Sequence, residues 1–157
     1  VDDSSSKGNK YSDIVKEIAA KEGANFMTLS VQIESEISQL ETKEEKAEFL
    51  KELGLEASGL DRLIREAYAL LNLITYFTAG EKELHLWTIH KGTKAPAAAG
   101  VIHTDFEKGF IRAEVIKCKD ILEYKTEAAV KEKGLLHVEG KDYVFEDGDI
   151  ANFRFNV

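Results

Sequence analysis

The sequence predicts an α+β protein, with helices in its first half and a small mixed sheet in its second. Between residues 9 and 74, apolar side chains recur mostly at spacings of three and four, which is the period of amphipathic helices. After residue 74 the pattern changes to short runs of β-branched and aromatic residues divided by turn signals. The length of 157 residues, with 43% hydrophobic and 32% charged residues, is typical of a globular chain of one or two small domains. We therefore expect two domains, residues 1–73 and 74–157.

The first segment is expected to hold three helical stretches and one buried strand. Residues 9–23 are predicted to form an amphipathic helix, followed by a short apolar strand over 25–31. An acidic helical stretch over 33–54 restarts at Thr42, because threonine followed by glutamates is a typical helix start. A further helix is expected over 58–74. The apolar faces of the first and last helices are formed by Tyr11, Ile14, Val15 and Ile18, and by Leu60, Leu63, Ile64, Ala67, Leu70 and Leu71.

The second segment is expected to form a mixed sheet of about five strands, crossed by one or two short helices. The candidate strands are 74–78, 83–90, 109–118, 135–140, 143–147 and 150–157. A short helix or loop is expected over 93–103, which holds the only proline, and a helix over 120–134.

Composition and charge exclude several classes of protein. The net charge of −8 argues against a protein that binds nucleic acid with its whole surface. No apolar run approaches the length that spans a bilayer, and the N-terminus lacks the pattern of a signal peptide. Cys118 is the only cysteine, so an intrachain disulfide is excluded. These features predict a cytoplasmic protein that does not act at a membrane.

The two glycines of "GLEASGLD" (54–61) have the spacing of a phosphate-binding loop but lack its chemistry. Leu60 and Asp61 stand where that loop needs a lysine and a serine or threonine. The stretch also lies between two expected helices, whereas a phosphate-binding loop follows a strand. We therefore expect helix ends here and no phosphate site.

The stretch "HTDFEKGF" (103–110) is open to several interpretations. A histidine beside carboxylates could transfer protons or bind a metal, but no nucleophile elbow accompanies it. The four histidines have no ligand-type spacing, so neither a metal site nor a catalytic residue is expected. Phe106 and Phe110 could stack on unpaired bases, or they could belong to the core.

A local positive balance keeps nucleic-acid contact open. Residues 87–119 hold six lysines and arginines against three acidic residues. Such cations could bind phosphates, or they could only solvate the surface. The candidate contacts are Lys91, Lys94, Lys108, Arg112 and Lys117.

Several stretches taken together resemble one family. "FTAG", "WTI", "KGTKAP", "HTDFEKGFI" and "DGDI" follow one another as in the C-terminal TGS domain of the YchF/Obg-like ATPases. The resemblance implies a β-grasp fold for residues 74–157 and a remnant of a P-loop NTPase domain for residues 1–73. The parent proteins of this family are ribosome-associated NTPases that use ATP or GTP with magnesium.

The resemblance also implies roles for residues near the N-terminus. Val1 and Asp3 resemble the end of the family's base-recognition motif, and Ser30 and Val31 resemble the loop that closes the base pocket. The phosphate-binding loop would lie upstream, so this chain is expected to bind no cofactor and to be inactive alone. We also expect residues 1–73 to be less ordered than the TGS domain.

Two functions follow from the resemblance as expectations. The TGS domain could serve as an RNA-binding, ribosome-binding or regulatory module, without DNA sequence specificity. Alternatively, it could be a protein-interaction module that covers the NTPase domain or a partner. In either case "HTDFEKGF" is expected to be structural: His103 and Asp105 hold a turn, Phe106 and Phe110 enter the core, and Lys108 stays outside.

Overall fold

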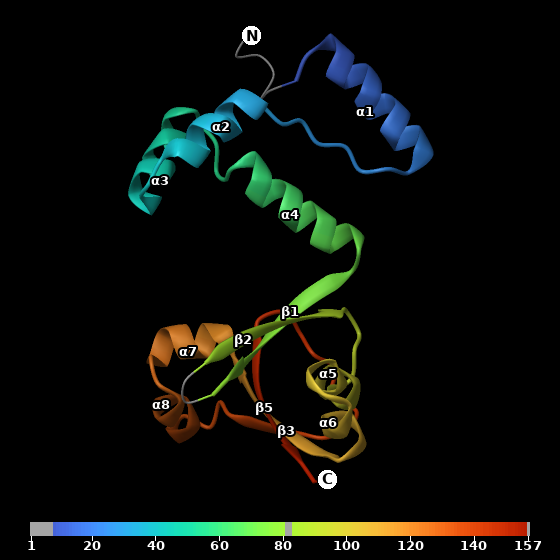
Figure 1. The fold of residues 1–157 in the computed structure, drawn as a ribbon, viewed down its shortest axis with the longest axis vertical. Helices are drawn as coiled ribbons and strands as arrows, with labels where there is room; N and C mark the ends of the chain where they lie inside the picture. Colours follow the sequence, from blue (N-terminus) through green and yellow to red (C-terminus); the bar gives the residue numbers. More distant parts are fainter. Residues whose placement is uncertain (1–7, 81–82, 157) are drawn as a thin grey trace. The chain divides into compact units, whose positions relative to one another are not determined.

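The computed structural model describes residues 8–80 and 83–156 and confirms the α+β class (Figure 1). The chain divides into two compact units, Val1–Leu70 and Leu71–Val157, which we call the N-terminal and C-terminal units. The first described strand begins at Leu73, just inside the C-terminal unit.

The described part of the N-terminal unit consists of helices. They are α1 (Lys10–Glu22), α2 (Val31–Gln39), α3 (Lys43–Glu52) and α4 (Gly59–Leu70). The predicted restart at Thr42 is confirmed: its side chain accepts the backbone N–H of Glu45, whose carboxylate accepts the N–H of Thr42. Glu34 of α2 similarly accepts the first amides of α4, from Gly59 at 2.7 Å and Leu60 at 3.1 Å. This contact joins α2 to α4 through the unpaired N–H groups of a helix start.

The strand predicted over 25–31 is wrong. Residues 24–30 have no regular secondary structure, and α2 begins at Val31. The apolar run has the composition of a strand, but a strand needs a neighbour for its backbone hydrogen bonds. No strand is described in residues 8–70 with which it could pair.

The C-terminal unit is built on a five-stranded mixed sheet in the order β2-β1-β5-β3-β4. The strands are β1 (Leu73–Ala79), β2 (Leu84–His90), β3 (Phe110–Lys117), β4 (His137–Glu139) and β5 (Asp149–Phe155). The β1–β2, β3–β5 and β3–β4 pairs are antiparallel, whereas β1 and β5 are parallel and central. The first and last strands of the unit in chain order therefore meet in the middle of the sheet.

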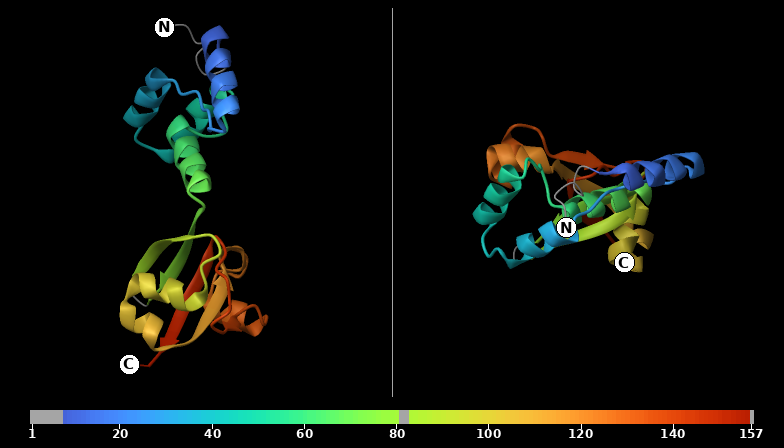
Figure 2. Two further views of the ribbon diagram at one scale, coloured as in Figure 1. Left: turned by 90° about the vertical axis from the view of Figure 1, so that its right-hand side faces the viewer. Right: turned by 90° about the horizontal axis from the view of Figure 1, so that it is seen from above.

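Short helices flank this sheet. Helices α5 (Ala95–Ile102) and α6 (Thr104–Lys108) lie on one side, and α7 (Cys118–Tyr124) and α8 (Glu127–Glu132) lie toward the other (Figures 1 and 2). The core lies mainly between the sheet and α5. At its centre Tyr76 is fully buried, packs on Phe145 with ring centroids 4.8 Å apart, and donates its hydroxyl to the carbonyl of Ala98 at 2.9 Å.

The strand predicted over 143–147 is also wrong. The segment between β4 and β5 forms turns, with one isolated bridge from Val144 to Lys94. Phe145 is 1% exposed, and Tyr143 packs against the same core. The alternating pattern therefore comes from a loop that inserts every second side chain into the core, rather than from a strand ladder.

"HTDFEKGF" forms α6 and the start of β3. His103 caps α6 by accepting the N–H of Asp105 on Nδ1 at 3.2 Å, so the expected turn contact is confirmed. Phe110 is 5% exposed, and Phe106 stacks on Phe155 with ring centroids 3.8 Å apart. Because Phe110 is buried in the core and the ring of Phe106 already stacks on Phe155, the segment has a structural role.

Gly109 in this stretch permits a close backbone approach, and Gly109→Ala is expected to lower the free energy of unfolding of the C-terminal unit by about 2 kcal/mol. An added Cβ would clash with the carbonyl of Asn156, whose N–H donates to Gly109 O at 2.9 Å. The end of β5 must therefore move away from β3. Urea denaturation measures the loss.

Gly140→Ala is the matched control for Gly109→Ala. Gly140 is exposed, and an added Cβ meets nothing within 4 Å, so the change should stay within about 0.5 kcal/mol. Equal stability of the two variants would contradict the close-approach argument.

Candidate functional site

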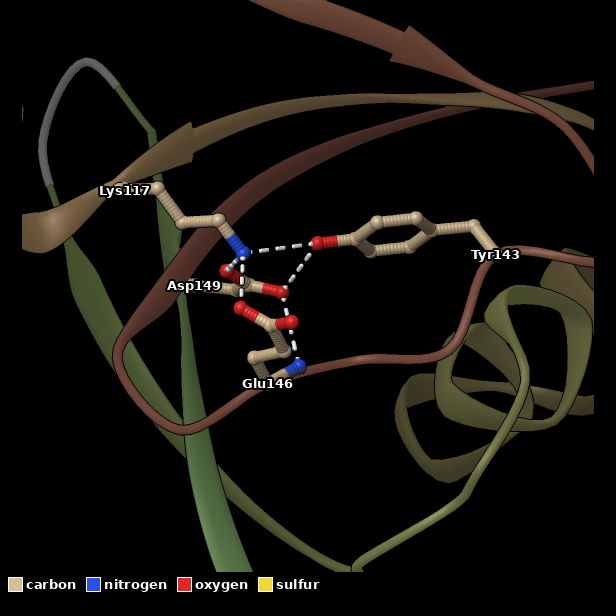
Figure 3. Close-up of polar contacts among 4 residues, drawn as sticks. All are labelled: Lys117, Tyr143, Glu146 and Asp149. Carbon is tan, nitrogen blue, oxygen red and sulfur yellow. Dashed lines mark hydrogen bonds and ion pairs between the residues drawn. The ribbon is translucent and has the colours of Figure 1, made fainter.

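A polar network surrounds the ammonium of Lys117 at the end of β3 (Figure 3). The ammonium donates to Asp149 Oδ1 at 2.7 Å, to Glu146 Oε2 at 2.8 Å and to the hydroxyl of Tyr143 at 3.1 Å. Asp149 Oδ2 accepts the Tyr143 hydroxyl at 2.7 Å and the backbone N–H of Glu146 at 2.9 Å. We call these four residues the Lys117 network.

The sheet register places the charged pair at the centre of this network. Lys117 and Asp149 are cross-strand partners in the antiparallel β3–β5 ladder. Tyr143 and Glu146 come from the loop that leads into β5. Asp149 is fully buried, whereas the side chain of Lys117 is 28% exposed. The network therefore anchors residues 143–149 to the end of β3.

The network holds its groups in inert protonation states. Burial opposes the charge on Lys117, but the hydrogen bonds to Asp149, Glu146 and Tyr143 outweigh it and raise the pKa of the ammonium above its usual range. Burial, and then the hydrogen bond to Asp149, raise the pKa of Tyr143 to about 12. At neutral pH Lys117 is therefore a cation and Tyr143 a neutral phenol. Neither group is poised as a base or nucleophile, and the network has a structural role.

One of the predicted nucleic-acid contacts, Lys117, is occupied by contacts within the Lys117 network. The sequence predicts that Lys117 faces phosphates, but three acceptors of the protein already bind its ammonium. A phosphate would have to compete for this ammonium with the carboxylates of Asp149 and Glu146. We therefore leave Lys117 out of the contact surface.

The other four predicted contacts lie at separate places in the C-terminal unit. Lys94 precedes α5 and pairs with Asp142 at 2.8 Å, with both side chains more than half exposed. Lys91 is exposed in the turn after β2, and Lys108 is exposed at the end of α6. Arg112 on β3 alternates with the buried Ala113, so it lies on the sheet face opposite α5. The cations do not form one strip.

Arg112 belongs to a small charged cluster on that face. The carboxylate of Glu114 lies 3.8 Å from Arg112 Nε and accepts two hydrogen bonds from Arg154, at 3.0 and 3.2 Å. The hydrogen bond from Arg154 is the main cause that lowers the pKa of Glu114. Arg154 thus lies in the same cluster as Arg112. The charge count over residues 87–119 could not include Arg154, because this residue lies outside that range.

The predicted base-pocket residues are only partly within the described chain. Val1 and Asp3 lie outside the described residues. Ser30 caps α2, where its Oγ accepts the N–H of Ile33 at 3.4 Å, and the side chain of Val31 is 75% exposed. The exposed Val31 is available to pack against a ligand or another part of a larger protein.

The C-terminal unit contains an apolar groove of about 780 Å³, which no pattern in the sequence predicts. We call it the β1–β5 groove because the ends of these two strands form its sides. Trp87 lies in its wall and donates its indole N–H to Thr78 Oγ1 at 2.9 Å. The groove is lined by Thr78, Ala79, Gly80, Glu83, His85, Trp87, Ile102, Phe106, Ala151, Asn152, Phe153 and Phe155.

Within 8–80 and 83–156, no three histidine, cysteine, aspartate or glutamate side chains are grouped as metal ligands would be. Over the same ranges, no helix has the length and apolar character needed to cross a membrane.

Comparison with known proteins places this geometry in a family. The family model YchF-GTPase_C, described as a protein of unknown function, matches residues 73–156. The chain is 58% identical over 151 residues to "Ribosome-binding ATPase YchF" of Haemophilus influenzae, a match that covers 96% of this chain and 41% of that protein. It is 53% identical over 150 residues to the Bacillus subtilis protein of the same name, again covering 96% and 41%. The chain thus spans about two fifths of the length of these relatives.

A solved structure agrees with the sequence matches. The YchF GTPase of Schizosaccharomyces pombe superposes with a TM-score of 0.81 at 44% identity, covering 94% of this chain and 39% of that one. A GTP-binding protein of Pyrococcus horikoshii, at 19% identity and a TM-score of 0.63, shares the fold. The chain belongs to the YchF family.

Proposed function

We propose that this chain is the C-terminal part of a cytoplasmic, ribosome-binding ATPase and that its C-terminal unit contributes to docking on the ribosome or its RNA. The observation that carries the proposal is the 58% identity, over 96% of the chain, to a protein named as a ribosome-binding ATPase. The whole protein would use ATP or GTP with magnesium. This chain contains no phosphate-binding loop motif, so hydrolysis would depend on the upstream part.

The C-terminal unit has the features expected of a TGS domain with a β-grasp fold. Its first and last strands are parallel neighbours at the centre of a mixed sheet, and α5 packs across one face. This arrangement supports the resemblance on which the TGS assignment rests. A compact sheet with short loops is suited to positioning contacts rather than to chemistry.

The exposed cations beside α5 and α6 are the proposed contacts with phosphate. Lys91 and Lys108 are exposed, and the pair between Lys94 and Asp142 lies at the surface. A surface ion pair contributes only about 0–1 kcal/mol, so Lys94 can exchange its partner for a phosphate at little cost. Arg112 would contribute separately, from the opposite face of the sheet.

The N-terminal unit supports the proposal of a larger parent protein. The apolar face predicted for α1 is present, but its four residues remain between 48% and 66% exposed: Tyr11, Ile14, Val15 and Ile18. Exposed apolar faces of this size normally pack against something. In the whole protein we propose that the NTPase domain covers them, with Val1, Asp3, Ser30 and Val31 near the nucleotide base.

Ribosome binding across a salt series tests the docking proposal. Replacing Lys91, Lys94 and Lys108 together by alanine is expected to weaken binding and to make the slope of log affinity against log salt shallower, by roughly two to three. The measurement is co-sedimentation of the 157-residue chain with purified ribosomes and with single-stranded RNA.

A control variant removes three other lysines of the C-terminal unit and so changes the net charge by the same amount. Lys131, Lys133 and Lys141 are also exposed in the C-terminal unit, and their triple alanine variant should bind almost normally. Equal losses in the two variants would show that only net charge matters. Binding that ignores salt, or no binding at all, would contradict docking through phosphate contacts.

A further inference from the structure

The two central strands of the sheet separate before they end. A hydrogen bond from Gly148 N–H to Thr75 O at 2.8 Å and the register pair Phe77–Ile150 join β1 to β5. Beyond that pair, no backbone pairing joins the two strands within the residues that the structure describes. Each strand nevertheless continues, β1 to Ala79 along β2 and β5 to Phe155 along β3.

This separation leaves strand edges that face a groove. Parallel neighbours normally share hydrogen bonds along their whole common length, so the ends of β1 and β5 present open edges to each other. The β1–β5 groove lies at this point, lined by residues 78–80 and by residues 151–153 and Phe155. An open edge inside a sheet accepts a further strand by main-chain hydrogen bonding.

The walls of the groove are suited to an apolar side chain. Trp87 from β2 and Ile102 and Phe106 from the helical side line it. Its volume of about 780 Å³ lies within the range of ligand sites, which is about 300–1,000 Å³. An occupant with both an extended backbone and an apolar side chain would satisfy the edges and the walls together.

The charges of the described lining residues favour a peptide over a polynucleotide as the occupant of the groove. Glu83 and His85 are the only titratable residues among the described part of the lining, and they lie 2.8 Å apart as a hydrogen-bonded pair. Among the described residues that line the groove there is no lysine or arginine, so none of them would neutralise a phosphate. A helical peptide would satisfy its own backbone and leave the strand edges open.

We propose that the β1–β5 groove binds an extended, uncharged segment of a partner protein, which adds main-chain hydrogen bonds to the open edges of β1 or β5. One bulky apolar side chain of that segment packs against Trp87, Phe106 and Phe155. The lining of the groove includes none of the proposed phosphate contacts Lys91, Lys94 and Lys108, and the inference does not rest on ribosome binding.

Peptide titration of the whole chain tests the site directly. The probes are pentapeptides with blocked ends. Their first, third and fifth residues are threonine, and their second and fourth residues are each valine, isoleucine, leucine or phenylalanine. Trp87 is the only tryptophan of the chain, so its fluorescence reports occupancy. At least one probe should bind with a Kd of about 1 mM or lower, and added salt should change this Kd little. It should also slow hydrogen exchange of groove-facing amides in residues 78–80 and 151–155.

Two controls separate strand addition from simple apolar binding. Ala79→Arg places a guanidinium in the groove and should weaken the best probe at least about tenfold, whereas Ala97→Arg, at an exposed position of α5 outside the lining, should not. Two further forms of the best probe carry N-methyl groups on alternate peptide nitrogens, one form on the odd-numbered and the other on the even-numbered nitrogens. One of these two forms should bind more weakly by a similar factor. No binding by any probe, or binding unaffected by Ala79→Arg or by both methylated forms, would overturn the proposal.

Discussion

Replacing Lys117 by methionine is expected to lower the free energy of unfolding of the C-terminal unit by about 3–5 kcal/mol. The substitution removes the cation but leaves Asp149, which is fully buried, without its charged partner. The Tyr143 hydroxyl and the Glu146 N–H would still donate to that carboxylate, at 2.7 and 2.9 Å, but neither carries a compensating charge. Urea denaturation followed by circular dichroism measures the loss.

The second residue of the pair provides the sharper test. If the cost arises from a buried, uncompensated carboxylate, then Lys117→Met combined with Asp149→Asn should be less destabilising than the sum of the single changes. Lys91→Met changes the same charge at an exposed position and should stay within about 0.5 kcal/mol. Simple additivity of the two changes in the network would show that the pair is not coupled.

Amide hydrogen exchange is expected to show a large stability difference between the two units of this chain. In residues 8–70 we expect opening free energies below about 2 kcal/mol, whereas the sheet of the C-terminal unit should be protected by about 5 kcal/mol or more. In the N-terminal unit the side chains of Ile33 and Ile37 are the only buried hydrophobics among the described residues. Helices of the length of α1, with 13 residues, are marginal in water without a packed face.

The apolar faces themselves provide the control for this measurement. Ile14→Ser and Leu63→Ser replace side chains that are 55% and 48% exposed, so each should hardly change the stability of the isolated chain. Val115→Ser replaces a core residue that is 1% exposed and should greatly reduce protection of the sheet. Strong protection throughout residues 8–70, independent of protein concentration, would contradict the prediction. Protection that rises with concentration would instead show that copies of the chain cover these faces.

Local sequence rules were sufficient for the elements whose stability is local. The helix start at Thr42 depends on side chains three residues apart, and the helix end at Gly23 uses a left-handed residue with φ 68°. The strand expected over 109–118 also followed from local alternation and is present as β3, Phe110–Lys117. Such signals are complete within one turn or one strand, so no distant contact is needed to recognise them.

Local rules failed where a partner decides the structure. Residues 25–31 have strand composition but no strand neighbour in the described N-terminal unit, and residues 143–147 alternate because Tyr143 and Phe145 insert from a loop. Lys117 was grouped with the surface cations for the same reason. Its sequence neighbours do not reveal that the β3–β5 register places it opposite a buried aspartate.

The sequence by itself determined the α+β class, the change from helices to sheet near residue 73, the family, and the structural role of "HTDFEKGF". Only the tertiary structure decided which cations are free at the surface, how the Lys117 network anchors the last loop, and where β1 and β5 separate to open a groove. The physical reason is that helix caps and strand patterns arise from neighbours along the chain. Burial of a charge and an open strand edge depend on which distant segments the fold brings together.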